Sequence, residues 1–219
     1  MEMSIDQIAR GPLVWFAFGV FVIGGLYRLI SMGRLASKEK TVWPTMDLRY
    51  GLRSLRHWVI PLQSHNMQQR PFYTLLSFAF HLCLLLTPLL AMGHAVLWQD
   101  SWGISWWSLP PLAADLMTLV VIGACGVFFL RRIALPEVRN VTSWTDYLLL
   151  LIVVGPFVTG FIAHHQLLPY RETIILHIVS GALWLIAIPF TRLSHMIWFT
   201  FTRAYMGSEF GAVRNARDW

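Results

Sequence analysis

Four histidines within two long apolar segments are the residues of this chain best suited to chemistry. Two lie in each segment: His81 and His94 in Phe72–Trp98, His177 and His195 in Thr173–Phe201. An ionisable side chain in a lipid-spanning segment is costly and usually functional. Two histidines on each of two helices could supply two bis-imidazole metal centres. In a pair of membrane helices the common centre of that kind is haem b.

The composition is typical of an integral membrane protein. The chain has 219 residues, of which 56% are hydrophobic and 13% charged, and its mean hydropathy is +0.56. Such values lie far from those of a soluble domain. Eleven tryptophans are also many for this length, and tryptophan gathers at membrane interfaces. We expect Cys83 and Cys125, both in apolar segments, to be buried and free of any disulfide or metal motif.

Five segments approach the roughly 20 residues that a membrane-crossing helix needs. They are Gly11–Ile30, Phe72–Trp98, Leu112–Leu130, Asp146–Ala163 and Thr173–Phe201. No segment alternates as a membrane β-strand does. The sequence therefore predicts an all-α membrane protein with five transmembrane helices, forming one domain over residues 1–219.

Basic residues gather in the loops of one side. The first and third connections and the C-terminal end carry most of them, whereas the opposite side has only Arg10 and Arg171. The positive-inside rule then predicts an external N-terminus and a cytoplasmic C-terminus. This asymmetry accounts for the net charge of +6 without nucleic-acid binding.

The first cytoplasmic connection contains an amphipathic segment at residues 46–66. One face carries apolar side chains and the other arginines: Leu48, Leu52, Leu55, Val59 and Leu62 against Arg49, Arg53 and Arg56. This pattern favours a helix lying on the inner leaflet. The alternative is a docking surface for a cytoplasmic partner.

Depth in the membrane predicts how the four histidines pair. The second and fifth helices run in opposite directions, so His81 and His195 form an inner pair, and His94 and His177 an outer one. On straight helices, eighteen residues between His177 and His195 make five turns, about 27 Å along one face. The thirteen residues between His81 and His94 leave them about 220° apart around the axis. We therefore predict a distortion near Thr87 and Pro88 that turns His94 toward the fifth helix.

Alternatives remain for these and for neighbouring residues. The four histidines could be core residues satisfied by hydrogen bonds, although each would need polar partners in a dry interior. Gly93 and Gly181 could leave room for a flat macrocycle or serve ordinary helix packing. His164 and His165, at the outer end of the fourth helix, could protonate a quinol, ligate a metal or face water. Arg171 and Arg192 could contact a haem propionate or a quinone, or anchor the interface.

Several stretches resemble a known family. They are ILHIVSGALWLIAIPFTRLSHMIW in the fifth helix, LRRIALPEVRNVTSWTDYLLLL between the third and fourth, and FHLCLLL in the second. Over about Phe78 to Trp198 the chain resembles the gamma subunit of respiratory nitrate reductase, a five-helix dihaem cytochrome b. The resemblance implies that His81, His94, His177 and His195 are the haem ligands.

The chain also departs from that family. The nitrate-reducing members place the second-helix ligands ten apart rather than thirteen, which leaves His164 or His165 as alternative ligands. The SWGISWWSLPP loop lacks the lysine that those members carry near their quinol site. In these features the chain looks more like the cytochromes of heterodisulfide-reductase-type and sulfate-reducer redox complexes. That likeness implies a cytoplasmic iron–sulfur subunit and a periplasmic multihaem cytochrome c as partners.

We therefore expect a dihaem cytochrome b subunit in a bacterial or archaeal cytoplasmic membrane. It would pass electrons between the iron–sulfur subunit and either menaquinone or the periplasmic cytochrome c. The sequence has no catalytic triad, phosphate loop or thiolate cluster, so substrate chemistry would belong to a partner. The alternatives are a haem-free or single-haem anchor for catalytic subunits, and a small transporter or proton channel that uses histidine relays.

Overall fold

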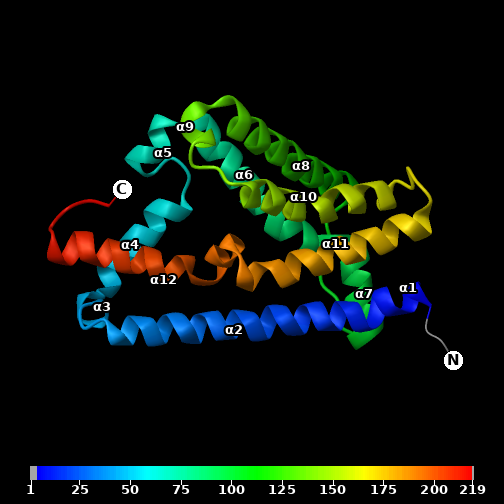
Figure 1. Cartoon of the computed structure of the whole chain (residues 1–219), viewed down its shortest axis with the longest axis horizontal. Coiled ribbons are helices and arrows are strands. Elements are labelled where there is room, and N and C mark those ends of the chain that lie inside the picture. The colour runs from blue at the N-terminus through cyan, green and yellow to red at the C-terminus, as the bar shows by residue number, and fades with distance from the viewer. Residues whose placement is uncertain (1–3, 219) are drawn as a thin grey trace. The chain divides into compact units, whose positions relative to one another are not determined.

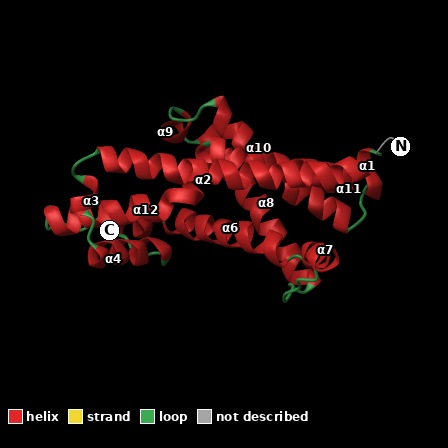
Figure 2. Cartoon of the chain, turned by 90° about the horizontal axis from the view of Figure 1, so that it is seen from below, coloured by secondary structure: helices red, strands yellow, loops and turns green. Residues whose placement is uncertain are grey.

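The computed structural model describes residues 4–218, which form helices and connecting loops with no strand (Figure 2). Five helical runs among them are long and apolar enough to cross a membrane. These runs are Ile5–Lys38, Pro71–Trp102, Pro111–Ala134, Trp144–His164 and Tyr170–Phe190. The predicted all-α membrane fold with five spans is confirmed, while its orientation stays a prediction.

The helices follow one another along the chain as labelled in Figure 1. The first part comprises α1 (Ile5–Ile8), the π-helix η1 (Ala9–Leu13), α2 (Val14–Lys38), α3 (Val42–Thr45), α4 (Leu48–Val59) and α5 (His65–Gln69). The middle comprises α6 (Pro71–Leu90), α7 (Met92–Trp102), α8 (Pro111–Ala134), α9 (Pro136–Arg139) and α10 (Trp144–His164). The last part comprises α11 (Tyr170–Phe190), the short 3₁₀ helix η2 (Arg192–Ser194), α12 (His195–Ser208) and the π-helix η3 (Glu209–Val213).

The chain divides into two compact units. The first unit contains residues 76–184 together with the N-terminal segment up to Arg10. The second contains Gly11–Leu75 and the residues from Leu185 onward. His81, His94 and His177 belong to the first unit, and His195 belongs to the second.

In the first unit, α8 lies against α10 (Figure 1). The buried side chains of α8 are small: Val121, Ala124 and Cys125. Small residues let two membrane helices approach closely, so that van der Waals contacts hold them together where lipid offers no hydrophobic driving force. Cys83 and Cys125 are both buried, as predicted.

The second membrane span is interrupted between its two histidines. Helix α6 ends at Leu90, Ala91 adopts an extended conformation (φ −63°, ψ 129°), and α7 begins at Met92. Pro88 lies two residues before the end of α6, where its missing N–H and its ring disfavour a continuous helix. The predicted distortion between His81 and His94 is thus confirmed, as a complete break rather than a bend.

The fifth span is shorter than predicted. Helix α11 ends at Phe190, not Phe201, and Thr191 is extended (φ −124°, ψ −173°). Pro189 weakens the last turn, and the Thr191 hydroxyl caps the next turn by accepting from the Leu193 amide at 3.2 Å. His195 is therefore the first residue of α12. The prediction that His177 and His195 share one face of a single straight helix is wrong.

The second unit accommodates this break with residues of α2. The Pro189 carbonyl, left without a helical partner, accepts a hydrogen bond from Arg28 Nε at 2.7 Å. Pro189 is fully buried, and a Cβ on Gly24 would lie 2.8 Å from its ring. Glycine at position 24 thus lets α2 pass close to the end of α11.

Of the predicted amphipathic segment 46–66, Leu48–Val59 forms α4, which packs on α12 within the second unit (Figure 1). Leu62, predicted on its apolar face, lies beyond the end of the helix in a left-handed conformation (φ 64°). The buried residues of α4 are Gly51 and Ser54, so the contact uses small residues. Leu48, Leu52 and Val59 remain 78%, 56% and 60% exposed. The predicted apolar face is thus present and available to lipid, whereas the buried contact lies on another face of the helix.

Arg203 ties α12 to α4 and to the C-terminal residues. Its Nε donates a hydrogen bond to the Ser54 hydroxyl at 3.1 Å. Its Nη2 donates to both the carboxylate and the backbone carbonyl of Asp218. Its guanidinium also lies 4.1 Å from the centre of the Trp58 ring. Burial lowers the pKa of the Arg203 guanidinium, and the Asp218 carboxylate raises it in opposition. The arginine therefore acts as a structural tie in this unit.

Candidate metal centre

The break in the second span sets the position of His94. Ending α6 at Leu90 leaves its last carbonyls without helical partners, and nearby groups satisfy three of them. The His94 Nδ1–H donates to the Pro88 carbonyl at 2.6 Å, and Trp106 Nε1–H donates to the Leu89 carbonyl at 2.8 Å. The Leu109 amide donates to the Leu90 carbonyl at 2.8 Å. The imidazole of His94 is thus part of the cap that closes α6.

The imidazole of His177 is held by the neighbouring helix α10. Its Nδ1–H donates to the Pro156 carbonyl at 2.9 Å. The ring also lies directly over Gly160, where an added Cβ would come within 2.9 Å of Cε1 and 3.0 Å of Nδ1. Only glycine leaves this space, so α10 fixes both the position and the tautomer of His177.

These two histidines face each other within the first unit. Their ring centroids lie 5.9 Å apart, and their planes differ by 15°. In each ring the Nδ1–H donates a hydrogen bond to a backbone carbonyl, which can only accept. The lone pair of the neutral imidazole therefore lies on Nε2. A carbonyl bonded to the second nitrogen is the usual support of a metal-ligating histidine.

The centroid separation of the two rings can be compared with that of two imidazoles bound on opposite sides of one metal ion. Metal–imidazole bonds of about 2 Å place two axial nitrogens about 4 Å apart, and adding about 1 Å from nitrogen to centroid on each side gives roughly 6 Å. The observed separation is 5.9 Å. Among residues 4–218, no further histidine, cysteine or carboxylate joins these two in a cluster of three or more potential ligands. The pair therefore offers two imidazole nitrogens, and any further donors of a shared centre would have to come from elsewhere.

His81 and His195 have similar but less diagnostic hydrogen bonds. The Nδ1–H of His81 donates to the Ser77 carbonyl at 2.7 Å, and that of His195 to the Arg192 carbonyl at 2.8 Å. Both bonds are local, and His57 on α4 makes the same bond to the Arg53 carbonyl. Both rings are exposed, and they belong to different units, so their pairing stays a prediction.

His164 and His165 lie at the C-terminal end of α10, close to Asp115, a residue that the sequence did not mark as a candidate. His165 Nε2 lies 3.0 Å from a carboxylate oxygen of Asp115, near the start of α8. One ligand atom from each of Asp115, His164 and His165 lies within 4.8 Å of the others. It is His94 whose ring lies against His177, so the two histidines of α10 form a separate cluster.

The remaining candidates stay predictions. A Cβ on Gly93 or on Gly181 would meet no atom within 4 Å, so the packing of the chain itself does not require glycine at either position. Arg171 is exposed, and the carbonyl of Arg192 accepts a hydrogen bond from the His195 Nδ1–H.

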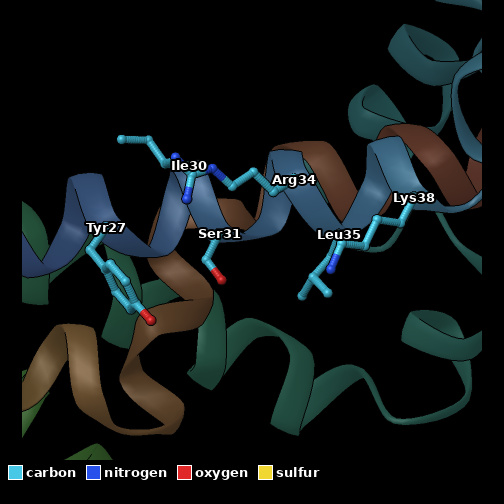
Figure 3. Close-up of a pocket in the computed structure, with 6 residues that line it drawn as sticks. All are labelled: Tyr27, Ile30, Ser31, Arg34, Leu35 and Lys38. Carbon is cyan, nitrogen blue, oxygen red and sulfur yellow. The ribbon is translucent and has the colours of Figure 1, made fainter.

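The pocket in Figure 3 has none of these histidines in its lining. It has a volume of 190 Å³ and is lined by six residues of α2: Tyr27, Ile30, Ser31, Arg34, Leu35 and Lys38. A single helix lines it, and two of its side chains are cationic. It offers no imidazole or thiolate and is no candidate for a transition-metal site.

The fold and the histidine pair together define a multi-pass helical membrane protein with two facing imidazoles in its spans. No protein-family model matches the chain. A protein of Nitratidesulfovibrio vulgaris strain Hildenborough is 34% identical over 212 residues, covering 93% of this chain and 92% of that protein. The chain belongs to the same family as this protein, whose name, "Protein", states no activity.

Proposed function

We propose that this protein is a cytochrome b subunit that carries electrons across the membrane through two haems b. The facing imidazoles of His94 and His177 carry the proposal, because both are oriented by backbone carbonyls at a separation suited to one metal ion. His81 and His195 would hold the second haem, as the resemblance to nitrate reductase gamma subunits implies.

The donor set favours haem over a bare metal ion. A protein-bound zinc ion needs three or four protein ligands, whereas this pair offers two imidazoles. A haem would bring the remaining donors of its iron with it, so that His94 and His177 would be the only protein ligands it needs. When bound, such a group supplies a reversible one-electron iron couple.

The chain's own residues would then orient the ligands of the centre. The Pro88 and Pro156 carbonyls hold the Nδ1 protons, so each Nε2 is fixed as a ligand without side-chain reorganisation. If haem is bound, His94 and His177 would both be occupied in holding it, which would favour electron transfer over oxygen binding. Electrons would pass between menaquinone or a periplasmic multihaem cytochrome c and a cytoplasmic iron–sulfur subunit.

The exposed apolar face of α4 fits the membrane setting of this proposal. Leu48, Leu52 and Val59 would insert into the inner leaflet, with Arg49 and Arg56 at the level of the anionic headgroups. That placement leaves the opposite side of the second unit for the iron–sulfur partner.

A pyridine haemochrome assay on the purified chain tests the proposal. We expect two haems b per chain in the wild type and one in His81→Ala. His57→Ala is the matched control, because His57 has the same local Nδ1 bond but lies on α4 outside the spans. It should retain both haems. A wild type without haem would instead support the anchor alternative, and a ratio near one would support a single-haem protein.

A further inference from the structure

Three potential metal ligands meet where α8 begins and α10 ends. His164 is the last residue of α10, and His165 caps it. Asp115 lies in the second turn of α8, whose start is set by Pro111 at its first position. None of the three belongs to the histidine pair of the proposed haem centre.

Backbone geometry, rather than chance rotamers, brings the two adjacent histidines to one place. On a regular helix, neighbouring side chains point about 100° apart. Here Gln166 adopts the left-handed conformation (φ 51°), and the turn is closed by hydrogen bonds from Gln166 N to Ala163 O (3.2 Å) and from Leu167 N to Ile162 O (3.1 Å). The helix therefore ends at His164, and His165 can turn its ring toward α8.

The side chains already lie close to a ligating arrangement. His165 Nε2 is 3.0 Å from Asp115 Oδ1, and the rings of His164 and His165 are 5.0 Å apart at 80°. The Phe161 ring lies 4.5 Å from that of His165 and limits its motion. All three ligand atoms are within 4.8 Å of one another. Donors bound to one ion at about 2.0–2.2 Å lie roughly 3–4 Å apart, so small side-chain rotations would suffice.

We infer that Asp115, His164 and His165 form a divalent transition-metal site, with Zn²⁺ as its natural occupant. Two imidazoles and one carboxylate are a common zinc ligand set that leaves a fourth position for water. Nitrogen donors disfavour Mg²⁺ and Ca²⁺, which prefer all-oxygen coordination. The side chains of His165 and Asp115 are 36% and 25% exposed, so an ion could reach them from solvent.

This site would act as a clamp between two helices. The ion would join the beginning of α8 to the end of α10, two helices that already pack together. A ligand that binds only the folded state stabilises it, so Zn²⁺ should raise the unfolding temperature of the chain. The inference is independent of the haem proposal, because it uses other residues and needs no electron transfer.

Zn²⁺ titration of the full-length chain, purified without a histidine tag and treated with chelator, tests the site. Isothermal titration calorimetry should give one Zn²⁺ per chain. Asp115→Asn and His165→Ala should each weaken binding by about tenfold or more. Asp115→Asn preserves the shape of the side chain, and far-ultraviolet circular dichroism checks the fold. His65→Ala is the control, because His65 is an exposed histidine outside the cluster.

The outcomes separate a built site from adventitious binding. Equal affinity in the wild type and Asp115→Asn would overturn the inference, since two adjacent histidines alone would then account for the binding. Equal loss in His65→Ala would overturn it as well. Haem content measured on the same samples should not change in any of these variants, so failure of this inference is distinguishable from failure of the proposed function.

Discussion

The imidazole of His177 on α11 donates its Nδ1 proton to the carbonyl of Pro156 on α10, across two helices, at 2.9 Å. This bond differs from the local ones of His81, His195 and His57, because it joins residues far apart in sequence. It makes α10 the support that orients the ligand nitrogen of His177. Disturbing α10 at this point should therefore disturb the centre without touching a ligand.

Gly160→Ala should damage the proposed outer haem site. The new Cβ would lie 2.9 Å from His177 Cε1, on a ring that the Pro156 bond prevents from moving away freely. Overpacking of this kind costs about 1–3 kcal/mol. We expect lower haem occupancy or a shifted midpoint potential for one haem only, measured by redox titration. Gly155→Ala is the matched control, because its Cβ would make an ordinary contact of 3.5 Å with Ser180. Equal spectra for Gly160→Ala and the wild type would contradict this support role.

How far the sequence predicts the structure is clearest at the two proline breaks. His81 and His94 would lie on different faces of a regular helix, and Thr87 and Pro88 lie between them. These features predict the interruption of the second span, because helical periodicity and proline are local signals in a sequence. The break after Pro189 escaped prediction, although Pro189 and the mostly polar run of residues 191–195 that follows it are local signals of a helix end. The partner of the Pro189 carbonyl, Arg28, is distant in sequence and carries no such signal.

The candidate site shows the same division. Depth and spacing pair His94 with His177, and the structure brings their rings together. Asp115 could not be joined to His164 and His165 from the sequence, because a lone carboxylate on another helix carries no local signal of its neighbours. The amphipathic pattern also does not predict that α4 buries Gly51 and Ser54, because which face of α4 is buried depends on the shape of α12.

Trp106→Phe should loosen the junction that carries His94. The change removes the hydrogen bond from the indole to the Leu89 carbonyl and keeps a smaller aromatic ring at the position. The expected cost is about 0.5–1.5 kcal/mol, seen as a lower unfolding temperature. Trp107→Phe serves as the neighbouring control, because Trp107 is 67% exposed. The capping role of the loop would be refuted if both variants unfolded at the wild-type temperature.

Gly207→Ala should separate α12 from α4. An added Cβ would overlap the Cβ of Ser54 and lie 2.8 Å from the Tyr50 carbonyl, so the helices would have to move apart. We expect faster tryptic cleavage at the arginines of α4 and a lower unfolding temperature. Gly33→Ala, on an open part of α2, should be neutral or stabilising by about 0.5–1 kcal/mol. Unchanged cleavage of Gly207→Ala would rule out this packing.

Asp218→Asn should destabilise the second unit through Arg203. The substitution leaves a nearly buried guanidinium without its counter-charge, which costs about 3 kcal/mol when one partner of a buried pair is removed. Because the carboxylate opposes the lowering of the Arg203 pKa by burial, its loss should lower that pKa further. Thermal unfolding measures the effect. Arg214→Gln, at an exposed ion pair with Glu209, should change stability by less than about 1 kcal/mol. Equal effects of the two substitutions would contradict the buried tie.

The sharing of one haem by His94 and His177 is the central claim, and haem counting in single and double variants tests it most directly. We predict that His94→Ala, His177→Ala and the double variant each retain one haem b per chain, because removing either ligand removes the same haem. Low-temperature electron paramagnetic resonance should show the same low-spin signal missing from all three. Two haems in either single variant, or a further loss in the double variant, would contradict the account.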